Sequence, residues 1–211
     1  MENKSIFTIF LIALVVVFGV GLLVSTRGNK TGQTAKGDDM ASHHTPPSPA
    51  DNIRFSALMG QAAPDFSLES YNGERVSLSA LKGKKVVLFF SEGAMCYPGC
   101  WDQVNAFAAG VKNFADKNAV VYTIIVDPKN DWKEAVDKEP KMASANVLMD
   151  TGGQISTKYG ALTVTSSMHR GQFPGHTYVV IDEEGIVRYL FDDESMLVRN
   201  KDLLAELEKI E

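Results

Sequence analysis

The sequence predicts an α/β domain in which a mixed central sheet is flanked by helices. From Ile53 to Glu211, short apolar runs rich in β-branched and aromatic residues alternate with segments that have the spacing of amphipathic helices. Near its end the chain has a strand pair joined by a short turn and then a closing helix. This alternation is typical of a sheet that is covered by helices on both sides.

Four runs are expected to be buried strands, because each is short and almost entirely apolar. They are Val86–Phe90, Val120–Val126, Val147–Met149 and Thr177–Ile181. The last run continues into a predicted hairpin, with a turn at Asp182–Gly185 and a second strand at Ile186–Phe191.

The clearest helix is expected from about Cys100 to Lys117, where apolar residues recur at the spacing of one helix face. We expect this face to be core, and its residues are Val104, Phe107, Ala108, Val111 and Phe114. A closing helix is expected from Asn200 to Glu211, with Asn200 as its N-terminal cap. Its apolar face consists of Leu203, Leu204, Leu207 and Ile210.

Length and composition restrict the possible functions. A chain of 211 residues, 45% of them apolar, can hold one domain of ordinary size plus an appendage. The formal charge is −5, the isoelectric point is near 5.4, and basic residues do not cluster. We therefore expect no nucleic-acid partner, since such a protein needs a basic face to neutralise phosphates. Two cysteines are too few for a scaffold of many disulfides.

An apolar segment near the amino terminus predicts a membrane anchor. Ile6–Val24 contains nineteen residues without a charge, which as a helix is long enough to cross a bilayer core of about 30 Å. A cleaved signal peptide is the alternative, but its apolar region is usually only about 7 to 15 residues long and is followed by a cleavage site of small residues. We therefore predict a transmembrane helix within an anchor segment at residues 1–27.

The positive charges around this segment bear on its orientation. Lys4 precedes it, whereas Arg27, Lys30 and Lys36 follow it, and this count by itself favours a cytoplasmic domain. A short amino-terminal tail carries little weight, however, and long domains are translocated largely regardless of charge. We expect a single-pass protein of the cell membrane whose domain lies outside the cytoplasm.

Residues 28–54 are predicted to be a flexible polar linker, because they are rich in Gly, Thr, Ser, Pro and Asp and nearly free of large apolar groups. The adjacent His43 and His44 in this linker are interpreted as solvated, with weak metal binding as the alternative. The folded domain is expected to span residues 55–211.

The two cysteines lie in the stretch FFSEGAMCYPGCWDQV, at the end of the strongest strand candidate and the start of the strongest helix candidate. In open α/β sheets, reactions usually take place at this edge. A thiolate near a helix amino terminus is favoured by the helix dipole, and a second cysteine one turn away can resolve the adduct that forms on the first. We expect an accessible pair in which Cys96 attacks and Cys100 resolves; the alternative is a purely structural disulfide.

Residues 60–211 resemble the redoxin group of the thioredoxin superfamily, which includes peroxiredoxins of the alkyl hydroperoxide reductase and thiol-specific antioxidant type and membrane-tethered thiol-disulfide relatives. The resemblance rests on GQAAPDFSLESYNGERVSLSALKGKKVVLFFSEGAMC and on FPGHTYVVIDEEGIVRY. It implies a thioredoxin-like fold and an oxidoreductase that uses Cys96 and Cys100 as its redox pair. The implied partners are a protein disulfide, a thiol reductant or a hydroperoxide, and no cofactor is implied.

The resemblance also implies roles for residues away from the cysteines. Pro174 corresponds to the superfamily's cis-proline, whose loop receives the substrate. Apart from the resemblance, Trp101, which follows Cys100, is expected to border the same site, with packing of the helix as its alternative role. Arg170 is the nearest candidate for the arginine that stabilises the thiolate in this family. Phe89 and Gly93 depart from the Pro-x-x-x-Thr/Ser-x-x-Cys pattern of the usual peroxiredoxins, and the CYPGC spacing departs from the CxxC of the disulfide-exchange relatives.

A second resemblance is to the Sco copper chaperones, which are also anchored and thioredoxin-like and have a CxxxC motif and a distant histidine before a strand. It rests on CYPGC, on His176 before TYVVID, and on a VDP turn at Val126–Pro128. In this alternative, Cys96, Cys100 and His176 bind copper, for which two thiolates and one imidazole are suitable ligands. Met95 and Met168 are candidates for weak additional ligands, although methionines usually fill cores.

Overall fold

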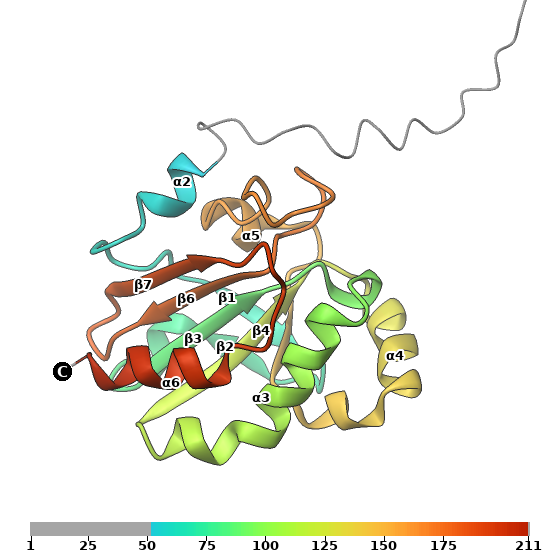
Figure 1. Ribbon diagram of the computed structural model, residues 1–211, viewed down its shortest axis with the longest axis horizontal. Helices are drawn as coiled ribbons and strands as arrows, with labels where there is room; N and C mark the ends of the chain where they lie inside the picture. The colour runs from blue at the N-terminus through green and yellow to red at the C-terminus, as the bar shows by residue number, and fades with distance from the viewer. Residues whose placement is uncertain (1–51, 211) are drawn as a thin grey trace, which may run out of the picture. The chain divides into compact units, whose positions relative to one another are not determined.

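The computed structural model describes residues 52–210, which belong to one compact unit (Figure 1). The predicted anchor, residues 1–27, lies outside the described residues and stays a prediction, as does most of the predicted linker. Among residues 52–210, no helix is both long enough and apolar enough to span a bilayer.

The core of the domain is a mixed sheet of seven strands in the order β2-β1-β5-β4-β3-β6-β7. The strands are β1 (Ser67–Ser70), β2 (Arg75–Ser77), β3 (Lys85–Phe90), β4 (Ala119–Ile125), β5 (Val147–Met149), β6 (Thr177–Ile181) and β7 (Val187–Asp192). β3 is parallel to β4 on one side and antiparallel to β6 on the other. The predicted mixed sheet and the β6–β7 hairpin are thus both present.

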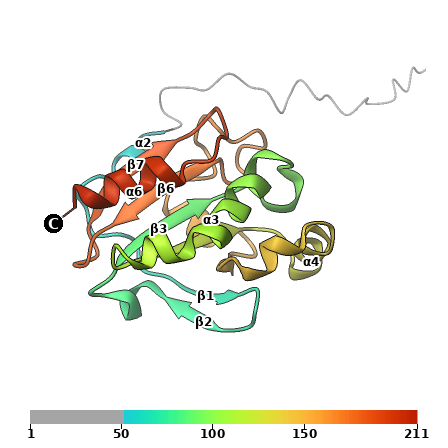
Figure 2. The same ribbon diagram turned by 60° about the horizontal axis from the view of Figure 1, so that its bottom comes forward.

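Helices cover both faces of this sheet, as the sequence predicts. They are α2 (Ile53–Ser56), α3 (Gly99–Ala115), α4 (Lys129–Lys138), α5 (Gln154–Lys158) and α6 (Asn200–Glu208), with short 3-10 helices η2 (Leu78–Leu81), η3 (Gly93–Met95) and η4 (Pro140–Ser144). Figure 2 shows α3, α4 and α6 on one face of the sheet. Because side chains of a strand alternate between faces, Val87 and Phe89 of β3 pack toward these helices, while Val86 and Leu88 pack toward α2 and α5.

The strands agree closely with the expectations from apolar runs. β5 and β6 have the predicted bounds, β3 begins one residue earlier than predicted, and β4 and β7 are each shifted by one residue at both ends. The short strands β1 and β2 and the helices α4 and α5 were not predicted. β1 and β2 contain mostly half-buried or exposed residues, so their apolar pattern is weak.

Two details of the predicted helices are wrong. Val111 was expected in the core but is 56% exposed, because the inner face of α3 is rotated toward α6 and includes Gln103 and Gly110. The N-cap residue of α6 is Arg199 rather than Asn200. The Asn200 side chain instead donates a hydrogen bond to the Ala106 carbonyl of α3, and Gly110 lacks a side chain that would block this approach.

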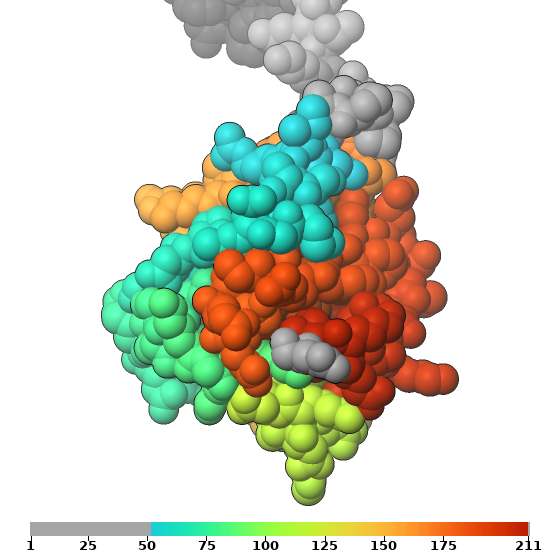
Figure 3. All heavy atoms as spheres, turned by 90° about the vertical axis from the view of Figure 1, so that its left-hand side faces the viewer, coloured from blue at the N-terminus to red at the C-terminus, as the bar shows by residue number. Residues whose placement is uncertain are grey.

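The start of the described chain closes the edge of the sheet at the end of β3 that is remote from the cysteines. Gly60 and Val187 donate hydrogen bonds to the carbonyls of Val187 and Gln61, respectively, and Ala63 donates to Gly185 in the β6–β7 turn. Figure 3 shows this face, with the first described residues (cyan) against the hairpin (orange to red). These bonds satisfy polar groups of β7 that an edge strand would leave unpaired.

Candidate active site

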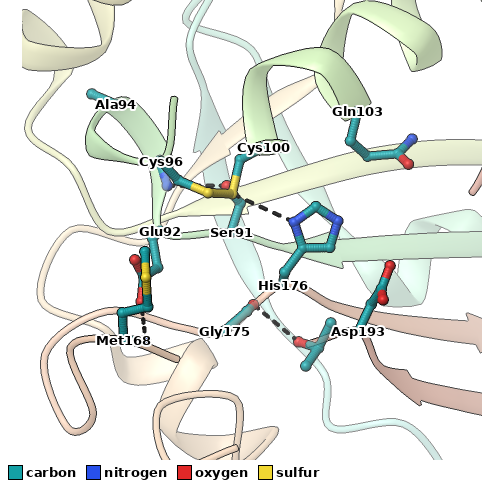
Figure 4. The surroundings of a disulfide bond; sticks show 12 residues. Ser91, Glu92, Ala94, Cys96, Cys100, Gln103, Met168, Gly175, His176 and Asp193 are labelled. Atoms are coloured by element: carbon teal, nitrogen blue, oxygen red, sulfur yellow. Dashed lines mark hydrogen bonds between the residues drawn. A yellow bond between two sulfur atoms is a disulfide. The ribbon is translucent and has the colours of Figure 1, made fainter. Parts of the chain in front are cut away.

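Cys96 and Cys100 form a disulfide in the segment that connects β3 to α3 (Figure 4), with an S–S distance of 2.02 Å and a Cα–Cα distance of 5.3 Å. Cys96 follows η3, and Cys100 lies in the first turn of α3. The pair therefore occupies the junction between strand and helix at the carboxyl end of β3, which is the position that the sequence predicts. Because Cys100 lies at the amino-terminal end of α3, the positive end of the helix dipole would stabilise a thiolate there.

The expected accessibility of the pair is wrong for this oxidised state. Cys96 is 3% exposed and Cys100 is 1% exposed, because both belong to the core cluster that contains Phe89 and Trp101. The residues on either side of Cys96 are exposed to solvent: Met95 is 50% exposed and Tyr97 is 73% exposed. The disulfide is thus covered, but large apolar side chains next to its first cysteine face the solvent.

A buried carboxylate shapes the turn that leads to Cys96. Asp127, just after β4, accepts a hydrogen bond from the backbone N–H of Ala94 at 3.1 Å. Gly93 has a φ of +68°, and a Cβ at this position would collide with Oδ2 of Asp127. Burial raises the pKa of Asp127, whereas the hydrogen bond from Ala94 opposes that rise. Position 93 therefore requires glycine both for its backbone conformation and for space.

A second buried carboxylate joins this turn to the loop before β6. Glu92 is fully buried and accepts hydrogen bonds from the backbone N–H groups of Met168, at 2.5 Å, and His169, at 3.2 Å. Its other oxygen lies 3.4 Å from Nδ1 of His169. Glu92 therefore links the backbone at Met168 and His169 to the segment that precedes Cys96, and Figure 4 shows Met168 beside Glu92.

His176 immediately precedes β6, and its Nδ1 lies 3.5 Å from Sγ of Cys100. The imidazole is fully buried and packs edge-on against Phe89, with ring centroids 4.6 Å apart. Burial lowers the pKa of His176 to about 4, although the nearby charge of Asp193 opposes this effect. The ring next to Cys100 is therefore uncharged at neutral pH.

Polar side chains surround the far nitrogen of this imidazole. Nε2 of His176 lies 2.8 Å from the Tyr178 hydroxyl, and that hydroxyl donates to Oε1 of Gln103 at 2.9 Å. Burial raises the pKa of Tyr178, so its hydroxyl stays protonated. Neither Tyr178 nor Gln103 was expected at the site, because each fits the pattern of its strand or helix without a functional role.

The predicted cis peptide bond at Pro174 is wrong. In residues 52–210 the cis peptide bond precedes Pro98, between the two cysteines. Pro174 is buried two positions before His176, and His176 is the residue that meets the disulfide at the start of β6. Gly175 packs so tightly against Val164, Ser166 and Ser167 that a Cβ there would collide with them.

Trp101 and Arg170, the other predicted site residues, contact different parts of the domain. Trp101 packs edge-on against Tyr97, with ring centroids 5.1 Å apart, and borders a cavity of about 340 Å³ together with Met95 and Asp127. Arg170 donates a hydrogen bond to the carbonyl of Thr165. The assignment of Trp101 and Pro174 to substrate binding stays a prediction, as does the role of Arg170.

The three ligands of the copper alternative also come together. One ligand atom each from Cys96, Cys100 and His176 lies within 4.8 Å of the others. Both sulfurs are joined in a disulfide, however, and the thiolate is the form of cysteine that binds a metal. The copper alternative therefore applies only to the reduced protein and stays a prediction.

Comparison with known proteins favours the redox alternative. The AhpC/TSA family model matches residues 59–190, which is more than half of the chain. The chain is 32% identical over 135 residues to a putative chloroplastic peroxiredoxin Q of Oryza sativa subsp. indica, an alignment that covers 64% of this chain and 59% of that protein. It is 31% identical over 144 residues to peroxiredoxin Q of Sedum lineare, with coverage of 68% and 74%, respectively.

A solved structure agrees with this assignment. The peroxidoxin BcpB of Mycobacterium tuberculosis superposes with a TM-score of 0.61 and 27% sequence identity, covering 73% of this chain and 98% of that protein. The mixed sheet with helices on both faces is thus thioredoxin-like, as the first resemblance implies. With a family model that extends from residue 59 to residue 190 and a redox-capable cysteine pair inside it, this chain belongs to the AhpC/TSA family.

Proposed function

We propose that this chain is a thiol peroxidase in which Cys96 and Cys100 alternate between dithiol and disulfide. The observation that carries the proposal is the Cys96–Cys100 disulfide at the carboxyl end of β3, beside a neutral histidine, in a chain of the AhpC/TSA family. The relatives named peroxiredoxin support a hydroperoxide as the oxidant.

The proposed cycle balances with a hydroperoxide and an external dithiol. The Cys96 thiolate attacks one peroxide oxygen, the O–O bond breaks, and the leaving alkoxide takes a proton, which yields an alcohol and a sulfenic acid on Cys96. The Cys100 sulfur then attacks the Cys96 sulfur, the S–O bond breaks, and water leaves with the proton of the Cys100 thiol. The external dithiol reduces the disulfide with two electrons and completes the turnover.

The surroundings of each cysteine support this division of roles. Cys96 is flanked by the exposed Met95 and Tyr97, so a small local movement of their turn would uncover its sulfur. Cys100 has His176 Nδ1 at 3.5 Å from its Sγ, and this nitrogen can accept the thiol proton when the disulfide closes. We therefore assign attack to Cys96 and resolution to Cys100.

Exchange with protein disulfides is the second candidate function. Phe89 and Gly93 stand where the usual peroxiredoxins have the proline and the hydroxyl residue of their motif, so this chain lacks that hydroxyl donor before Cys96. The exposed Met95 and Tyr97 offer an apolar contact for a polypeptide. In this reaction the Cys96 thiolate attacks a substrate disulfide, and Cys100 releases the second substrate thiol.

Two assays on the full-length chain separate the candidates. Consumption of cumene hydroperoxide and reduction of insulin, each with dithiothreitol as electron donor, should both be lost in Cys96→Ser. Cys100→Ser should still complete the first step and accumulate a mixed disulfide or a sulfenic acid on Cys96, which mass spectrometry detects. If the wild-type chain consumes neither oxidant, the proposed function is wrong.

We also propose that residues 1–27 anchor the domain in the cell membrane and that the domain lies outside the cytoplasm, with residues 28–54 as a tether. The uncharged run Ile6–Val24 supports the anchor. Protease treatment of intact cells tests both points. Loss of the domain from the membrane fraction after this treatment is expected, and a domain that stays intact until the cells are lysed contradicts the orientation.

A further inference from the structure

A chain of hydrogen bonds with a single direction leads from the α3 backbone to the disulfide. Nδ2 of Asn200 donates to the carbonyl of Ala106 at 2.7 Å, and a carbonyl can only accept. The Asn200 oxygen is thereby left to accept from Nε2 of Gln103, at 2.8 Å. The amide of Gln103 is therefore oriented with its oxygen toward Tyr178.

A second backbone group fixes the same orientation. The N–H of Arg199 can only donate, and it donates to Oε1 of Gln103 at 2.7 Å. The Tyr178 hydroxyl also donates to this oxygen, at 2.9 Å, and its other acceptor is the Leu197 carbonyl at 3.4 Å. Because a hydroxyl has one hydrogen and both of these partners accept, the hydrogen of Tyr178 is directed away from His176.

This direction determines which imidazole nitrogen carries the hydrogen. The Tyr178 oxygen lies 2.8 Å from Nε2 of His176 and has only its lone pairs to offer there. Nε2 must therefore be the donor, and in a neutral imidazole the other nitrogen is then unprotonated. That nitrogen, Nδ1, is the one 3.5 Å from Sγ of Cys100. Phe89 packs against both the His176 and the Tyr178 rings and keeps them in this arrangement.

We propose that Gln103 and Tyr178 are positioning residues that keep the hydrogen of His176 on Nε2, so that the bare Nδ1 accepts a hydrogen bond from the reduced Cys100 thiol. This inference rests on the proposed function for its significance, because it identifies the groups that orient the base of the resolving cysteine. The hydrogen bond exists only in the dithiol state, since the disulfide has no S–H. It therefore favours the reduced form of the pair.

Nitrogen NMR of the full-length, ¹⁵N-histidine-labelled chain in its reduced state at neutral pH tests the tautomer without any substrate. In the wild type we expect a pyridine-type shift for Nδ1 of His176 and a pyrrole-type shift for Nε2. In Tyr178→Phe and Gln103→Leu, the protonated fraction of Nδ1 should increase. A pyrrole-type shift for Nδ1 in the wild type would overturn the inference even if neither variant folds.

The equilibrium between the cysteine pair and a reference dithiol provides the second readout. Loss of one hydrogen bond to the reduced form should lower the equilibrium constant for reduction up to about tenfold in both variants, which corresponds to a midpoint potential up to about 30 mV lower. The matched control is Tyr159→Phe, since the buried Tyr159 hydroxyl donates to the Pro64 carbonyl and makes no contact with the cysteines.

The outcomes distinguish this inference from the proposed function. An unchanged tautomer and an unchanged potential in folded Tyr178→Phe and Gln103→Leu refute the positioning role, even if the enzyme turns over. The expected shifts in a chain that consumes neither hydroperoxide nor insulin support the positioning role and refute the proposed function. An equal change of the potential in Tyr159→Phe would show that any lost tyrosine hydroxyl has this effect, and it would also refute the inference.

Discussion

The carboxylate of Asp127 occupies the space in which a side chain of residue 93 would lie, so Gly93 is required by a residue 34 positions away. The same carboxylate accepts the hydrogen bond of Ala94. One buried acid thus defines the path of the chain toward Cys96, and the shape of this turn depends on the end of β4 as well as on its own sequence.

Gly93→Ala should therefore destabilise the protein by at least about 2 kcal/mol, since it combines an unfavourable positive φ with a collision. Gly73→Ala is the matched control, because Gly73 also has a positive φ but has open space around its Cα, so its cost should be only about 1 kcal/mol. Urea unfolding of both variants measures the difference. Equal losses would show that Asp127 moves aside at no cost.

Tyr97→Ala should slow the reduction of insulin several-fold and leave the reaction of the disulfide with dithiothreitol nearly unchanged. The side chain of Tyr97 is 73% exposed next to Cys96, so a polypeptide partner can contact it, whereas a small dithiol has no need of it. Val111→Ala removes another exposed apolar side chain (56% exposed) from the distant half of α3 and should change neither rate. Parallel loss of both rates in Tyr97→Ala would contradict a role in partner contact.

Acid should destabilise the protein through His176. Its folded-state pKa is about 4 and its unfolded-state pKa is about 6.5, so between these values the unfolded chain binds more protons and stability falls as pH falls. The full effect of this pKa difference is on the order of 3 kcal/mol. His176→Gln should reduce the loss of unfolding free energy between pH 7 and pH 4.5, measured by urea unfolding. Identical slopes for the variant and the wild type would contradict the burial effect.

Glu92→Ala should loosen the loop that contains Met168 and His169. The change leaves two backbone N–H groups without their acceptor, each at a cost of about 1 to 3 kcal/mol where it stays buried. Hydrogen exchange at residues 165–171 should accelerate at least tenfold. Glu69→Ala is the control, since the side chain of Glu69, on β1, forms an exposed ion pair with Lys129, and it should leave exchange in this loop unchanged.

Much of the fold could be predicted because buried strands have a strong local signal. β5 consists of apolar residues and β6 almost entirely so, and the bounds of both strands agree with the prediction to the residue. Val111 could not be placed correctly, because the buried face of α3 depends on where Asn200 of α6 approaches Gly110. The spacing of apolar residues in α3 does not indicate where α6 packs against it.

In the site, too, residues were predictable only where neighbouring sequence determines their placement. The cysteine pair could be predicted because both residues lie in one five-residue segment between a strand and a helix. Glu92, Asp127 and Gln103 could not, because their partners lie 33 to 97 positions away. Tyr178 could not either, because its hydroxyl donates to Gln103, 75 positions away. His176 was identified only through its resemblance to a copper ligand, and its contact with Cys100 spans 76 positions.

The antiparallel pairing of β3 with β6 sets Phe90 opposite Thr177, immediately before the cysteine segment on one strand and immediately after His176 on the other. The separation between sulfur and imidazole is therefore governed by main-chain register, and a slip of one residue would turn the histidine to the opposite face. Transplanting the pentapeptide CYPGC into another scaffold would consequently not reproduce this chemistry. The smallest transferable unit is the pair of adjacent strands together with the first turn of α3.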